Sequence, residues 1–300
     1  MDRPLRSLYS EDCGGGKETD GNLLPSGLRV VVVKDTLTFS SVEYFLSALS
    51  SPSCKIVELV LDSIYVDSTL MQKLVCTLSL NRSITTVSLA NCGIDGTCAS
   101  HISSLSCSSG VKTINFKGNY LGDEGIAAVS NLLKKNKNII YIDFEDNGIG
   151  DPGIESLVAT ILAPDLSMQG SYSNSHIFHL QVLGFGCNKI THSGLDSLLK
   201  LCTLNCNITS LDVSGNLYIG DSSISMLSNF VLENKSLRHI DISNTSVSAK
   251  GLDALFVPLK ENDALVNICV SHKGFTPSTN PITELGADFY SVQKCYISSL

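Results

Sequence analysis

Residues 111–126 read VKTINFKGNYLGDEGI, and residues 139–154 read IIYIDFEDNGIGDPGI. In both stretches apolar residues alternate up to Asn119 or Asn147, an apolar residue follows two positions later, and a glycine follows six positions later. The alternation predicts a short β-strand, and the apolar spacing that begins at Ile126 predicts one buried helix face. Each stretch therefore encodes a strand, a loop and the start of a helix.

This unit recurs nine times at a nearly constant period. The position taken by Asn119 and Asn147, called here the spine position, falls at Thr36, Ile64, Cys92, Asn119, Asn147, Asn188, Asn216, Thr245 and Lys273. The steps between these positions are 28, 28, 27, 28, 41, 28, 29 and 28 residues. A period in this range predicts a solenoid, in which each unit buries its apolar face against its neighbours. An asparagine at the spine position is expected to bond the backbone of adjacent turns, which Ile64 and Lys273 cannot do.

The repeat predicts an α/β solenoid with a parallel sheet on one side and helices on the other. A helix is about 10 Å wide and a strand about 4.8 Å, so the stack should curve into a horseshoe with a concave sheet. About nine 28-residue repeats should occupy residues 27–275. The 41-residue step places an insertion at residues 163–175, with the composition of an exposed loop. Residues 1–26 are expected to be a flexible segment, and residues 276–300 to cap the end of the core.

Composition excludes several classes of function. The net charge is −8 and no basic stripe is visible, which argues against a nucleic-acid partner. No apolar run approaches the about 18 residues of a membrane span, and the N-terminus lacks the apolar core of a secretory signal. The 11 cysteines form no C-x-x-C pair, so we expect reduced thiols in a cytoplasmic protein.

Two stretches carry a family resemblance. Residues 180–188, LQVLGFGCN, and residues 119–125, NYLGDEG, resemble leucine-rich repeats, and the 28-residue unit with its helix resembles the ribonuclease-inhibitor subclass. Proteins with similar repeats include ribonuclease inhibitor, the Ran GTPase-activating protein, innate immune receptors, actin-regulating scaffolds and subunits of ciliary complexes. Nearly all of them bind another protein, but a shared fold does not choose among them.

The resemblance implies a non-enzymatic protein-interaction scaffold or adaptor. One alternative is a structural subunit of a larger ciliary or cytoskeletal assembly, which would place the chain in the cilium or cytoskeleton. A second alternative is a GTPase-activating protein similar to the Ran activator, because residues 146–150 resemble loops that such proteins place against their GTPase.

The alternation of the strands also predicts which side chains face a partner. The outward positions hold eight carboxylates and two cations, Lys34 and Lys117, a difference of −6. The carboxylates are Asp35, Glu58, Asp62, Asp143, Glu145, Asp146, Asp212 and Asp241. An acidic concave face should attract a basic protein partner. The predicted partner-binding residues are Asp62, Lys117, Tyr141, Asp143, Glu145, Asp146, Asp212 and Asp241.

The sequence predicts no catalytic residue, no cofactor and no metal site. Asp212 and Asp241 should lie side by side on adjacent strands, but on an open surface where their pKa values should stay ordinary. Cys202 and Cys206 have the spacing of one helix face. No histidine completes a zinc site there, so both are expected to be buried structural thiols.

Overall fold

The computed structural model describes residues 30–32, 39–105, 110–163 and 179–270. The chain forms two compact units, Met1–Asn147 and Gly148–Leu300. The predicted N-terminal segment, residues 164–175 of the predicted insertion and the predicted C-terminal cap lie outside the described residues, as do Lys34 and Asp35.

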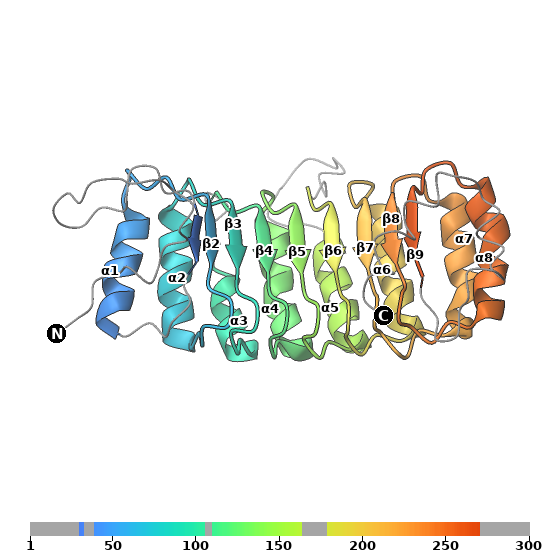
Figure 1. The fold of residues 1–300 in the computed structure, drawn as a ribbon, viewed down its shortest axis with the longest axis horizontal. Coiled ribbons are helices and arrows are strands. Elements are labelled where there is room, and N and C mark those ends of the chain that lie inside the picture. Colours follow the sequence, from blue (N-terminus) through green and yellow to red (C-terminus); the bar gives the residue numbers. More distant parts are fainter. Residues whose placement is uncertain (1–29, 33–38, 106–109, 164–178, 271–300) are drawn as a thin grey trace. The chain divides into compact units, whose positions relative to one another are not determined.

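The first unit alternates strands and helices. Its elements are β1 (Val30–Val32), α1 (Phe39–Ser50), β2 (Glu58–Val60), α2 (Ser68–Leu80), β3 (Thr86–Ser88), α3 (Gly96–Ile102), β4 (Thr113–Asn115), α4 (Gly122–Lys135) and β5 (Tyr141–Asp143). The strands pair in parallel and in chain order, β1-β2-β3-β4-β5. Thr113 of β4, for example, is the partner of Thr86 in β3 and of Tyr141 in β5. The helices line one side of the sheet, as predicted (Figure 1).

The second unit continues the same alternation. Its elements are α5 (Asp151–Leu162), β6 (Val182–Gly184), α6 (His192–Leu204), β7 (Ser210–Asp212), a 3-10 turn η2 (Asp221–Ser223), α7 (Ile224–Glu233), β8 (His239–Asp241), α8 (Ala249–Glu261) and β9 (Asn267–Cys269). Its strands are also parallel and follow the chain, β6-β7-β8-β9. No helix in the described ranges is long and apolar enough to span a bilayer.

The core lies between the strands and the helices of each unit. The middle residue of each short strand points inward, and Leu59, Ile142 and Leu183 are fully buried. Two larger side chains follow β4 and β5: the rings of Phe116 and Phe144 stack with their centroids 6.1 Å apart, and both are fully buried. The aliphatic periodicity of the sequence is therefore the pattern of burial.

The spine asparagines form the predicted ladder. The side-chain oxygen of Asn119 accepts hydrogen bonds from the backbone N–H groups of Cys92 at 2.9 Å and Ile94 at 3.0 Å. Its amide nitrogen donates to the carbonyls of Leu89 at 2.8 Å and Phe116 at 2.7 Å. One buried side chain thus satisfies backbone groups of two successive repeats, which have no partner within a strand or helix.

The residue before the spine position has a second shared property. It adopts a left-handed conformation in seven copies, with positive φ at Ser63, Asn91, Gly118, Asp146, Cys187, Gly215 and Asn244. This conformation makes the turn that leads each strand into its loop. Glycine, asparagine and aspartate enter it at the lowest cost, which accounts for five of these seven residue types.

A second set of asparagines ends the helices. Asn81, Asn136, Asn205, Asn234 and Asn262 are the C-cap residues of α2, α4, α6, α7 and α8. The Asn81 amide donates to the carbonyl of Leu49 at 2.6 Å, and its oxygen accepts from the N–H groups of Ser83 and Ile84 at 2.8 Å. The amides of Asn234 and Asn262 likewise donate to the carbonyls of Cys202 and Val231. These three side chains connect neighbouring helix ends, as the spine asparagines connect neighbouring strand ends.

Candidate functional site

The surface to be tested is the outward side of the strands, called here the strand face. In β2, β4, β5 and β7 the two end residues are half-buried and the middle residue is buried, so the end residues form this surface. Because the chain divides into two compact units, the strand face is described in each of them in turn.

In the first unit, polar side chains cross the strand face as a connected network. The Ser88 hydroxyl donates to the Asp62 carboxylate at 2.6 Å, and the backbone N–H of Ala90 donates to the same oxygen at 3.0 Å. The Asn115 amide then donates to Ser88 at 3.1 Å. The predicted binding residue Asp62 therefore also holds the neighbouring repeat in place.

The network continues to the predicted centre of the site. Asn115 accepts from the backbone N–H of Lys117 at 2.9 Å, and the Lys117 ammonium lies 2.6 Å from the Glu145 carboxylate. Both side chains of this ion pair are partly exposed, so it stabilises the fold by only about 0.2–1 kcal/mol. The backbone N–H of Glu145 donates to Asp143 at 2.9 Å. The structure thus brings Lys117, Asp143 and Glu145 together, with Tyr141 half-buried on the same strand as Asp143.

Asp146 differs from the other predicted residues of this unit. It is exposed in the turn after β5, and its φ is +53°. This is the left-handed position before the spine, where aspartate is favoured for its backbone conformation. The backbone alone therefore explains an aspartate at this position.

In the second unit, Asp212 and Asp241 lie opposite each other on β7 and β8. Each carboxylate accepts a hydrogen bond at 2.8 Å from the backbone N–H two residues later, that of Ser214 and that of Ser243. Asn115 and Asp143 make the same turn in the first unit. The acidic residues at the central outward position therefore fix the chain where it leaves the strand.

The expectation of ordinary pKa values is wrong for Asp241. Burial raises the pKa of the Asp241 carboxyl, and the charge of Asp212 raises it further, although Ser243 opposes the shift by hydrogen bonding. On an open surface this carboxylate would be fully hydrated, whereas Asp241 is half-buried. The face is therefore less hydrated at this point than alternation alone predicted.

The predicted pairing of Cys202 and Cys206 is also wrong. Helix α6 ends at Leu204, so Cys206 lies beyond the helix and is exposed, while Cys202 is fully buried. Burial raises the pKa of the Cys202 thiol to about 12. Within the described ranges, no group of three His, Cys, Asp or Glu side chains is placed to hold a metal ion.

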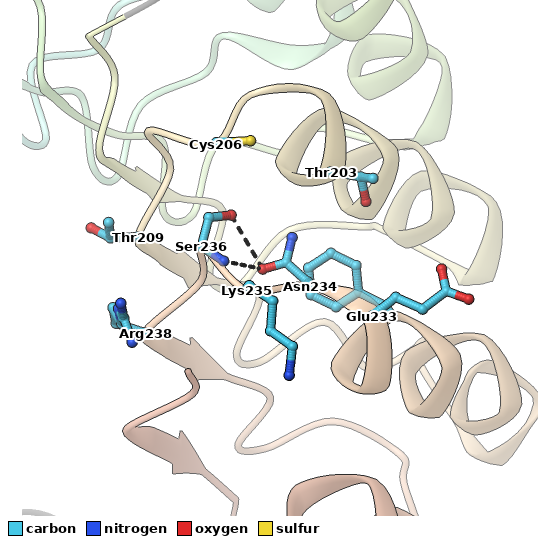
Figure 2. A pocket seen from close by; sticks show the side chains of 9 residues that line it. Thr203, Cys206, Thr209, Glu233, Asn234, Lys235, Ser236 and Arg238 are labelled. Atoms are coloured by element: carbon cyan, nitrogen blue, oxygen red, sulfur yellow. Dashed lines mark hydrogen bonds between the residues drawn. The ribbon is translucent and has the colours of Figure 1, made fainter. Parts of the chain in front are cut away.

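The second unit also has a groove of about 590 Å³ where α6 and α7 end and β7 and β8 begin. Figure 2 shows Asn234 in this groove, with both the N–H and the hydroxyl of Ser236 bonded to its side-chain oxygen. Its two cations are engaged at its rim, since Lys235 pairs with Asp263 at 3.0 Å and Arg238 donates to the carbonyl of Ala264 at 2.8 Å. Its lining residues include one carboxylate, Glu233, and one thiol, Cys206, and no histidine.

Two exposed tyrosines were missed by the sequence argument. Tyr65 is 71% exposed and Tyr120 is 75% exposed, each one residue after the spine position of its repeat. The sequence does contain a signal for them. Tyr65 and Tyr120 stand at a position where the neighbouring repeats have glycine, Gly93 and Gly148. An aromatic residue where neighbouring repeats have none marks a position that packing does not require.

Comparison with known proteins adds the family context. A model of the leucine-rich repeat matches residues 135–158, 204–228 and 233–256. The chain is 30% identical over 99 residues to the ribonuclease inhibitor of Sus scrofa, covering 33% of this chain and 19% of that protein. It is 24% identical over 250 residues to NACHT, LRR and PYD domains-containing protein 14 of Mus musculus, covering 77% of this chain and 25% of that protein.

The chain therefore spans 19% and 25% of the lengths of these two relatives. Among solved structures, an internalin (inlF) from Listeria monocytogenes str. 4b F2365 superposes with a TM-score of 0.42 and 14% identity, covering 76% of this chain and 65% of that chain. A superposition of this quality carries no information about function.

Proposed function

Since the chain is a leucine-rich-repeat protein of the ribonuclease-inhibitor type, we propose that it is a non-enzymatic protein-interaction scaffold or adaptor. Its partner, in this proposal, is a basic protein that binds the strand face, which the repeat predicts to be concave. The eight described cysteines are thiols, as expected for a reducing compartment, and we place the function in the cytoplasm.

The observation that carries the proposal is the charge and order of the strand face. In the first unit, the described residues of the strand face include four carboxylates, Glu58, Asp62, Asp143 and Glu145, and the cation Lys117, which pairs with Glu145. In the second unit, the strand positions add two further carboxylates that lie opposite each other. A surface with this sign of charge attracts a basic partner and speeds its encounter.

The hydrogen bonds of these residues support binding as well as folding. A carboxylate held by a backbone amide keeps one orientation, so little side-chain freedom is lost when a partner binds. Asp143 is held in this way by the N–H of Glu145. The turn therefore fixes the orientation of the Asp143 carboxylate.

The test must remove charge without breaking the turns. Asparagine keeps the side-chain oxygen that accepts the backbone N–H, so the triple variant Asp143→Asn, Asp212→Asn, Asp241→Asn removes three charges from the strand face. The matched control is the triple variant Glu155→Gln, Glu233→Gln, Glu261→Gln, which removes three charges from exposed helix positions.

Tagged wild-type and variant chains should be used as baits in affinity purification with quantitative mass spectrometry. We expect the asparagine variant to lose the proteins that wild type recovers, and the glutamine control to keep them. Equal recovery by all three baits would rule out the strand face as the binding surface, provided that their melting temperatures agree.

A further inference from the structure

Among the described residues of the first unit, the two most exposed tyrosines lie at one edge, where strands lead into helices. Tyr65 follows the spine position of the β2 repeat, and Tyr120 follows that of the β4 repeat. The loop between them, after β3, has Gly93 at the same position. We call Tyr65, Gly93 and Tyr120 the tyrosine edge. Its two rings are among the most exposed large side chains in the described part of the chain.

The middle loop contacts the ring of Tyr65 and the backbone of Tyr120. A side chain at Gly93 would begin 3.1 Å from one carbon of the Tyr65 ring and 3.2 Å from the next, so this ring rests against the Gly93 backbone. The backbone N–H of Tyr120 donates to the carbonyl of Ile94 at 2.8 Å, and Tyr120 also forms a parallel bridge with Asp95. An aromatic ring on a fixed backbone offers a large contact area at a low entropic cost.

The helices that follow these three loops begin with carboxylates. Asp67, Asp95 and Glu124 are exposed at the starts of α2, α3 and α4. The loops at residues 61–67, 89–96 and 116–124 contain one basic residue, Lys117, and its ammonium pairs with Glu145 at 2.6 Å. The edge therefore presents negative charge to a partner.

Helix structure explains these carboxylates but not the tyrosines. Asp67 and Asp95 cap helices, and Asp95 accepts from the hydroxyl of Thr97 at 2.6 Å and the N–H of Cys98 at 3.0 Å. An acidic residue at a helix N-terminus also complements the helix dipole. Neither effect needs an exposed aromatic ring beside it. Exposed tyrosine combined with carboxylate is the composition that recognises guanidinium groups, by stacking on the ring and by charge-assisted hydrogen bonds.

We propose that the tyrosine edge, with Asp67, Asp95 and Glu124, binds an arginine-rich segment of a protein partner. This inference rests on the proposed scaffold function and names a second contact surface, distinct from the strand face. Arginine is favoured over lysine because its planar guanidinium stacks on an aromatic ring and hydrogen-bonds a carboxylate at the same time.

The experiment measures binding of a fluorescently labelled peptide of alternating arginine and glycine to the full chain, by anisotropy. The double variant Tyr65→Ser, Tyr120→Ser removes both rings. Its matched control, Leu217→Ser, Tyr218→Ser, removes two side chains of the second unit that are 65% and 68% exposed. A peptide of alternating lysine and glycine, of the same length and charge, tests the preference for guanidinium.

We expect the Tyr65→Ser, Tyr120→Ser variant to bind the arginine peptide about five- to thirtyfold more weakly, as two exposed cation–π contacts predict. The Leu217→Ser, Tyr218→Ser control should bind as wild type does, and the lysine peptide should bind wild type more weakly. Absence of binding to wild type would overturn the inference, and so would equal affinity in the tyrosine variant or equal loss in the control.

The strand-face asparagine variant separates this inference from the proposed function. If that variant weakens peptide binding and the tyrosine variant does not, the tyrosine edge is refuted while the acidic strand face stands. If the tyrosine variant alone weakens binding, the edge is supported independently of the strand face.

Discussion

Replacing Asn119 by alanine tests whether the spine ladder holds the repeats together. The substitution removes the acceptor for the N–H groups of Cys92 and Ile94, and Asn119 is only 3% exposed. Each buried donor left without a partner costs about 1–3 kcal/mol, so the two together predict a loss of about 2–6 kcal/mol. The carbonyl of Leu89 also loses its side-chain donor, which places the expected value in the upper part of that range, whereas the carbonyl of Phe116 keeps the Asn147 amide.

Thr245→Ala is the matched comparison, because Thr245 takes the spine position in its own repeat. Its hydroxyl donates to the carbonyl of Ile242, within the same turn, at 2.8 Å. Loss of one such bond should cost about 1 kcal/mol. Urea denaturation followed by far-UV circular dichroism measures both variants, since the chain has no tryptophan to report by fluorescence. An Asn119→Ala variant that loses no more stability than Thr245→Ala, at unchanged denaturant dependence, would refute the ladder as the main link between repeats.

Three further outcomes follow from the structure. Asp241→Asn keeps the acceptor for Ser243 and removes a carboxylate whose pKa is raised, so it should raise the melting temperature at pH 7. The gain should disappear as the pH falls toward 3.8, the ordinary value for aspartate, because the wild-type carboxyl is then protonated; a gain independent of pH would contradict this reasoning. Phe144→Ala removes half of a buried ring stack and should cost about 3–5 kcal/mol in denaturant titration, and a loss below about 1 kcal/mol would mean that the stack is not part of the core. In the native protein, maleimide should label the exposed Cys206 and leave Cys202 unlabelled, as peptide mass spectrometry can show; equal labelling would place Cys202 at the surface.

The repeat and its spine could be predicted because they depend on residue types that recur at a fixed step. Leu59 and Ile142 are buried while the residues on either side of each are partly exposed, so burial in these strands follows the predicted alternation. Asn119 was expected to bond adjacent turns because the side chain at the spine position can reach their exposed backbone groups, and it does so. Periodicity assigns such positions without knowledge of any contact.

The chemistry of the strand face could be predicted only in part. A carboxylate on a strand can contact a partner, and it can also accept a hydrogen bond from the backbone of the turn that follows. Alternation placed Asp143 and Asp212 on the face, but their bonds to backbone amides two residues later depend on the turn that follows. The raised pKa of Asp241 depends on its burial, which one sequence does not report.

One extra residue in a single repeat changes which of its side chains is buried. The step from Asn216 to Thr245 is 29 residues, and the extra residue lies in the loop. Tyr218, at the position that is buried in other repeats, is 68% exposed, and Ile219 is buried in its place. An insertion of one residue therefore changes which side chain enters the core. The periodic pattern alone does not show which of the two neighbouring side chains becomes exposed.

The helix-ending asparagines also bear on glycan attachment. Asn81-Arg82-Ser83 and Asn234-Lys235-Ser236 both match the N-glycosylation sequence, which normally marks an exposed loop. Yet the nitrogen that a sugar would modify on Asn81 donates to the carbonyl of Leu49, and Asn81 is 5% exposed. A glycan on Asn81 and a folded helix end exclude each other, so a sugar added there before folding would leave this repeat unable to close.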